Sequence, residues 1–230
     1  MNILLITLFL LITAPVLSPA DGELLPPIAD KAGAETPELD LIAHFPLRDG
    51  TVWKYNSNLG EIVSRVRVSG PLYTIRSESS PLDITRHLRL EEKGIMMIGG
   101  TSRVYFITTK RTYQPPLLRF PRQTVIGKIW RWEGKEVVDD EIIKSRVEGV
   151  IEKKETVRVP AGEFSCLKVK VETVSDDGTK SSSIQWLAPE VGIVKGEVAI
   201  DAGGLSGFLI DLLGFDHYNL ELVEMIIPGN

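Results

Sequence analysis

The chain has 230 residues, of which 43% are hydrophobic, and its 31 acidic and 26 basic side chains give a formal net charge of −5. This length is enough to bury one sizeable core. The only cysteine, Cys166, excludes an internal disulfide framework, and the acidic balance argues against nucleic acid as a partner.

The N-terminal segment is predicted to be a secretory signal. Residues 3–17 are almost uninterrupted hydrophobics and precede Ser18, Pro19 and Ala20, residues that suit a signal peptidase. The run is shorter than the roughly 20 apolar residues that span a bilayer. Residues 1–20 are therefore expected to be cleaved, leaving no transmembrane span, with a retained anchor as the alternative. No cysteine ends the leader, so the protein is expected in the periplasm or outside the cell without Cys-linked lipid.

Residues 21–44 are predicted to be a flexible acidic linker. They contain three prolines, six acids and one lysine, and they show no sustained apolar period. Residues 45–230 show no break in composition and are expected to form a single β-rich globular domain.

Charge is distributed unevenly along this domain. Between Arg103 and Arg131 there is no acidic residue, whereas after Lys195 there are only acids. Arg119, Arg122 and Lys128 could form a basic patch for anionic headgroups, glycans or an acidic partner. The favoured alternative is that the basic middle lies beside the acidic C-terminal strands, so that the two charges compensate.

Period-two alternation is clearest between Glu155 and Ile200. Leu167, Val169 and Val171 point to one side and the residues between them to the other, as in a half-buried strand. Turns are expected at residues 160–162 and 176–178, which end in glycine. This part is predicted to be an antiparallel meander.

Other strands are expected at 62–68, 72–77, 85–90, 95–98, 103–109, 142–151 and 218–227. About a dozen strands with little helical period predict a mainly β fold. We expect a large curved antiparallel sheet or open half-barrel with at most one or two short helices. Residues 205–215 are either a short helix or an apolar loop.

One pattern occurs twice, with Phe-Pro preceding a glycine and then two aromatics that share a strand face. It is either a duplicated strand start within one sheet, which we prefer, or the mark of two tandem units. These aromatics and a later tryptophan are candidates for the wall of a ligand site, with filling of the core as the favoured alternative for each: Trp53, Tyr55, Trp130, Trp132 and Trp186.

Four segments carry a family resemblance: FPLRDGTVWKY at 45–55, LLRFP at 117–121 with GKIW at 127–130, VRVPAGEFSCLKV at 157–169, and WLAPEVGIVK at 186–195. On these motifs the chain resembles a family of exported bacterial domains of unknown function, related in fold to the lipoprotein-localisation (LolA/LolB-like) half-barrels. The resemblance implies a concave sheet that could hold an acyl chain or hydrophobic peptide. It implies no catalytic residue.

We find no catalytic or metal-binding motif in the sequence. His44, His87 and His217 are far apart, and Asp139–Glu141 resembles a solvated turn more than a calcium loop. Cys166 is expected to be buried. No metal and no cofactor are therefore predicted.

The leading hypothesis is a non-enzymatic envelope or secreted protein that binds an apolar ligand, either a lipid or an acylated or hydrophobic partner. The alternative is a structural or protein-interaction module of an envelope assembly. An exported hydrolase comes third.

Overall fold

The computed structural model describes residues 38–80, 82–202 and 216–228, and all regular elements in these ranges are β-strands. The signal segment, linker residues 21–37 and the apolar segment 205–215 lie outside the described residues. None of the described residues belongs to a helix that could cross a membrane.

Fourteen strands follow one another in the part of the chain that the structure describes. They are β1 (Leu39–Asp40), β2 (Val52–Ser57), β3 (Gly60–Ser69), β4 (Leu72–Glu78), β5 (Leu82–Glu91), β6 (Gly94–Val104), β7 (Ile107–Pro121), β8 (Gln123–Thr124), β9 (Ile129–Val138), β10 (Glu141–Val159), β11 (Gly162–Ser175), β12 (Lys180–Ala188), β13 (Gly192–Asp201) and β14 (His217–Ile226). β1 pairs only with β8, and the other twelve form one closed antiparallel barrel in the order β10-β11-β12-β13-β14-β2-β3-β4-β5-β6-β7-β9.

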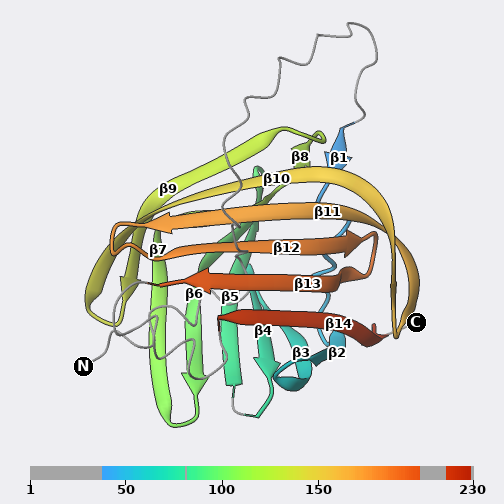
Figure 1. Cartoon of the computed structure of the whole chain (residues 1–230), viewed down its shortest axis with the longest axis horizontal. Helices are drawn as coiled ribbons and strands as arrows, with labels where there is room; N and C mark the ends of the chain where they lie inside the picture. The colour runs from blue at the N-terminus through green and yellow to red at the C-terminus, as the bar shows by residue number, and fades with distance from the viewer. Residues whose placement is uncertain (1–37, 81, 203–215, 229–230) are drawn as a thin grey trace, which may run out of the picture.

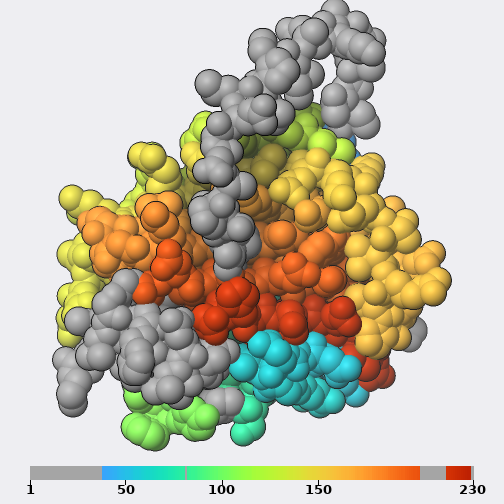
Figure 2. Space-filling view, viewed as in Figure 1, coloured from blue at the N-terminus to red at the C-terminus, as the bar shows by residue number. Residues whose placement is uncertain are grey.

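The expected open sheet or half-barrel is wrong, because β14 pairs with β2 and closes the ring. Tyr55 lies opposite Leu222 across this seam, and Asn58 and Asn219 exchange two hydrogen bonds beside it. Figure 2 shows the residues of β2 and β3 packed directly against β14. Closure satisfies the backbone N–H and C=O groups that both edges of an open sheet would expose.

The barrel is made of two groups of strands that cross at a steep angle (Figure 1). β11 to β14 run across the view, and β4 to β7 run steeply behind them. β10 is 19 residues long and curves around one end of the barrel, with a register shift between Ile151 and Lys153 that marks an irregularity in its pairing. Crossed sheets of this kind place their inner side chains in a shared core.

Alternation along the strands fills this core. The meander after Glu155 is confirmed, with β10 to β13 joined by the expected turns, and Val169 and Leu187 are fully buried inside. Both copies of the repeated aromatic pattern begin strands of the same barrel, β2 and β9. The strand predicted over 103–109 is wrong, since Tyr105 and Phe106 form the turn between β6 and β7. Tyr105 takes a positive φ of 53° there without a glycine or asparagine to signal the turn.

One end of the barrel is covered by the described end of the predicted linker and the residues after it. Leu41 is fully buried, and its N–H donates to the carbonyl of Arg122 at 3.2 Å. The N–H of Glu190, in the β12–β13 turn, donates to the carbonyl of Ala43 at 2.9 Å. Phe45 follows and packs into the interior. Residues 38–46 therefore act as a cap on the interior.

Candidate functional site

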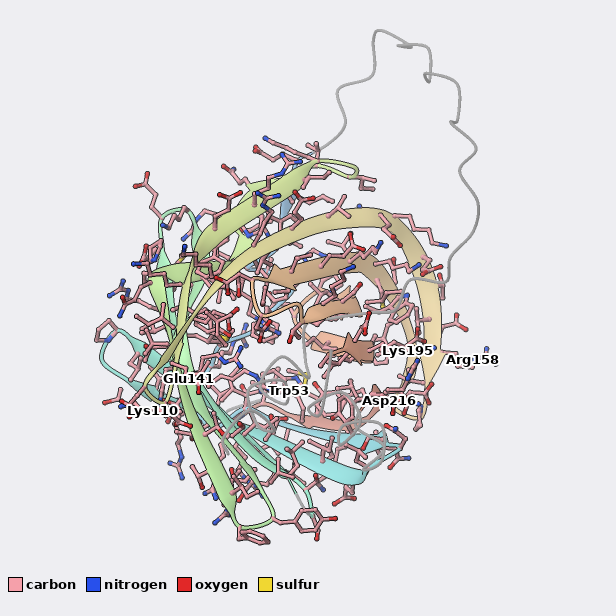
Figure 3. All side chains as sticks on the ribbon, turned by 60° about the vertical axis from the view of Figure 1, so that its left-hand side comes forward. Trp53, Lys110, Glu141, Arg158, Lys195 and Asp216 are labelled. Carbon is pink, nitrogen blue, oxygen red and sulfur yellow. The ribbon has the colours of Figure 1, made fainter. Side chains whose placement is uncertain are left out.

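A cavity of about 50 Å³, lined by buried side chains, lies inside the barrel, next to the cap. We call it the arginine cavity. Two arginines and an apolar wall dominate its lining, which includes Phe45, Trp53, Tyr55, Ser77, Arg86 and Arg119. In Figure 3, Trp53 lies within the ring of strands, whereas Arg158 lies at its outer side.

The aromatic wall is fixed by hydrogen bonds to the β12–β13 connection. Trp53 and Tyr55 alternate inward along β2, and the indole N–H of Trp53 donates to the carbonyl of Val191 at 2.7 Å. The Tyr55 hydroxyl donates to the carbonyl of Ile193 at 3.1 Å. Phe45 stacks on Trp53 with ring centroids 6.2 Å apart. Because their polar atoms are already bonded, Trp53 and Tyr55 offer a ligand mainly apolar surface.

Arg119 enters the cavity from β7. Its guanidinium carbon lies 5.8 Å from the ring centre of Phe45 and 5.1 Å from that of Phe120, distances at which a cation is attracted to an aromatic face. The Nη1 atom of Arg119 is buried and has no hydrogen-bond partner among the described residues. A second cavity, of about 20 Å³, lies beside Arg119 and Glu136, so Arg119 lines both interior spaces.

Arg86 enters from β5, where Ile84 and Leu88 flank it on the inner face. Its Nη1 donates to the hydroxyl of Ser77 at 3.3 Å, and its buried Nη2 has no partner among the residues described. Burial, and next the charge of Arg119, lower the pKa of Arg86 to about 9. Burial lowers the pKa of Arg119 to about 10. Both guanidiniums therefore stay charged at neutral pH.

Arg111, a third buried arginine, differs from Arg86 and Arg119 because it has a carboxylate partner. Arg111 and Glu136 form an ion pair and are both almost completely buried. In the described part of the chain, Glu136 is the only buried acidic residue. No carboxylate of the described residues therefore pairs with Arg86 or Arg119.

The five predicted wall residues do not form one surface. All are buried, but only Trp53 and Tyr55 line the arginine cavity. Trp130 packs over Gly149, and the ring of Tyr113 lies edge-on to that of Trp132, with centroids 5.8 Å apart. Trp186 lies on the outer face, with Lys168 and Lys195 over its ring and its N–H donating to Glu155 at 2.7 Å.

The predicted basic patch is not assembled either. Arg119 points into the barrel, whereas Arg122 is half-buried and donates to the carbonyl of Glu92 at 3.0 Å. Lys128 is exposed in a turn. These three residues therefore share no outer face.

The histidines lie on separate elements. His44 contacts the carbonyl of Asp40, His87 the hydroxyl of Thr74, and His217 the carboxylate of Asp216. No group of three or more metal-ligating side chains occurs among residues 38–80, 82–202 and 216–228. Cys166 is buried.

The sequence analysis missed Arg86 as a site residue and placed Arg119 on the surface. A signal was present, since Ile84, Arg86 and Leu88 occupy alternate positions of one strand and must share a face. An arginine on an otherwise apolar strand face indicates either a buried charge or an outward-facing strand. The pattern alone does not decide between them.

Comparison with known proteins gives a partial match to one family. A DUF3108-like family model matches residues 140–207, in agreement with the expected resemblance to uncharacterised domains, whereas the relation to the LolA/LolB half-barrels remains a prediction. No curated protein matches the chain significantly.

Three solved structures are similar at low sequence identity. The hypothetical lipoprotein YmcC from Escherichia coli is 10% identical, with a TM-score of 0.42 over 78% of this chain and 85% of that one. A "putative lipoprotein" from Parabacteroides distasonis is 14% identical, with a TM-score of 0.37 over 80% of this chain and 98% of that one. A "putative exported protein with YmcC-like fold" from Bacteroides fragilis is 15% identical, with a TM-score of 0.32 and the same coverage. Similarity at this level does not identify a function.

Proposed function

We propose that this chain is an exported, non-enzymatic binding protein that holds a compact ligand inside its barrel. The observation that supports this is the arginine cavity, in which an apolar wall surrounds two convergent, incompletely bonded cations. Ligand sites characteristically combine apolar walls with a few placed polar groups. The leader in residues 1–20 supports export.

The size of the cavity favours a small ligand over a lipid. Sites for drug-sized molecules typically occupy about 300–1,000 Å³, and the arginine cavity has about 50 Å³. An acyl chain would need the core around Trp53 to open. In place of the lipid or hydrophobic partner expected from the sequence, the proposed ligand is a molecule, or a ligand group, of a few non-hydrogen atoms.

Native mass spectrometry of the protein purified from its periplasmic or secreted fraction tests this proposal. We expect a bound small molecule, or a melting-temperature increase with members of a panel of small acids, amides and alcohols. Ligand-induced fluorescence change should be lost in Trp53→Phe, whose ring lines the cavity, and kept in Trp186→Phe, whose ring lies outside. A protein that carries no ligand and responds to no compound would refute the proposal.

A protein-interaction role is the second candidate, supported by the β6–β7 turn. Tyr105 and Phe106 are 62% and 90% exposed at its tip. On one side β5 pairs with β6 up to Val104, and on the other side Asp139 exchanges hydrogen bonds with Lys110, so the two aromatics lie at the exposed end of the hairpin. An exposed aromatic tip suits a concave apolar site on an envelope protein.

Crosslinking in the native host tests this second role. One reproducible partner should be recovered and then lost in Phe106→Ser, while Ile142→Ser, a change at an exposed position of a different hairpin, should keep it. Equal recovery with both variants would exclude the β6–β7 tip as the contact.

A further inference from the structure

The arginine cavity brings together two cations from strands that are not neighbours. Arg86 lies on β5 and Arg119 on β7, with β6 between them. Ser77 holds one guanidinium, and the rings of Phe45 and Phe120 flank the other. Neither side chain has a carboxylate within ion-pair distance among the described residues. Their positions are therefore set by neutral neighbours.

A buried positive charge without a counter-charge is costly, and this cost normally removes such residues from a core. Nη2 of Arg86 and Nη1 of Arg119 each retain an unsatisfied N–H group. The same interior contains an arginine with a carboxylate partner, Arg111, which forms an ion pair with Glu136. Among residues 38–80, 82–202 and 216–228, a buried carboxylate thus pairs with Arg111 and none pairs with the two arginines of the cavity.

We propose that Arg86 and Arg119 bind the carboxylate of a small organic acid in the arginine cavity. This inference rests on the proposed binding function and names its ligand class. Guanidinium groups present planar, forked donors that match the two oxygens of a carboxylate. The single negative charge of the acid would offset one of the two positive charges, and its oxygens could accept from Nη2 of Arg86 and Nη1 of Arg119.

The cavity also indicates the size of the acid. A water molecule needs about 10–15 Å³ of such space, so about 50 Å³ suits a few water molecules or a small acid such as acetate. Trp53 and Leu88 line the same space and offer apolar contact to the methyl end. Inorganic phosphate has no apolar end to contact Trp53 and Leu88, so it fits this lining less well.

Titration of the mature chain with acetate and propionate at neutral pH, followed by calorimetry and melting temperature, tests the inference. Acetamide and propionamide serve as uncharged isosteres, and phosphate serves as a separate arm. We expect saturable binding of the acids and at least tenfold weaker binding of the amides. Arg119→Met and Arg86→Met should each weaken acid binding at least tenfold, and Arg122→Met, at a half-buried arginine outside the cavity, should leave it unchanged.

Arg119→Lys and Arg86→Lys provide a second test if either methionine variant fails to fold. They keep the charge but lose the forked geometry, so acid binding should be reduced but detectable. Acids and amides that bind equally would overturn the carboxylate assignment and leave the binding function standing. If phosphate binds and acetate does not, the carboxylate assignment is also overturned. If no compound binds, both proposals are refuted.

Discussion

Replacing Arg119 by methionine should stabilise the protein in the absence of added organic acids. Burial lowers the pKa of Arg119 from its ordinary 12.5 to about 10. At about 1.4 kcal/mol per pKa unit, the folded protein disfavours the charged form by roughly 3 kcal/mol. Methionine has a similar length, carries no charge, and packs well against aromatic rings such as those of Phe45 and Phe120.

Part of this gain is offset by the loss of the contacts between the cation and the two rings, which contribute roughly 0.5–2 kcal/mol. We therefore expect the free energy of unfolding to rise by about 1–2 kcal/mol in Arg119→Met. Urea unfolding in dilute Tris chloride measures this as a higher midpoint with an unchanged slope. Arg122→Met, outside the cavity, serves as the control and should change stability little.

Added acetate should reverse the order of stability. A ligand that binds only the folded state stabilises the wild type increasingly with concentration, whereas the variant lacks the binding group. A variant that is less stable than the wild type by more than about 1 kcal/mol without acetate would refute this reasoning. Arg119 would then be a structural residue, and its unsatisfied donor would have no functional meaning.

Three further changes test other parts of the structure. Glu136→Gln should destabilise the barrel by about 3–5 kcal/mol in urea unfolding, because it removes the carboxylate charge that pairs with the buried Arg111; a loss below 1 kcal/mol would contradict the ion pair. The Cys166 thiol, whose pKa burial raises to about 11, should resist a thiol reagent at pH 8 until the protein is unfolded, and rapid labelling of the native protein would show that it is accessible. Gly149→Ala should lower the melting temperature and alter tryptophan fluorescence, since its new Cβ would lie 2.3 Å from the Trp130 ring.

Much of the strand structure could be predicted because it is encoded locally. The alternation of Leu167, Val169 and Val171 and the Asp-Gly turn at 177–178 each depend on a few neighbouring residues. The turn at Tyr105 was missed because nothing in its residue types marks it. Closure of the barrel depends on the pairing of two distant strands, β2 and β14. That pairing is determined by the registers of all the strands between them.

The candidate site was harder to predict for the same reason. Aromatic spacing correctly indicated that Trp53 and Tyr55 share a buried face, but Trp186 points to the opposite side of the sheet. Arg119 was assigned to the surface because it lies in a basic stretch, residues 103–131, that has no acidic residue. Its inward position follows from the register of β7, which sequence spacing alone does not specify.

The seam between β2 and β14 has a consequence for how the protein is made. Asn58 and Asn219, which bond to each other beside it, are 161 residues apart in the chain. Contacts between such distant segments form slowly, and until β14 is synthesised the outer edge of β2 has no partner. A nascent chain would therefore expose an unpaired, aggregation-prone strand edge for most of its synthesis. Assistance from a chaperone before residues 217–226 arrive would favour correct assembly over aggregation.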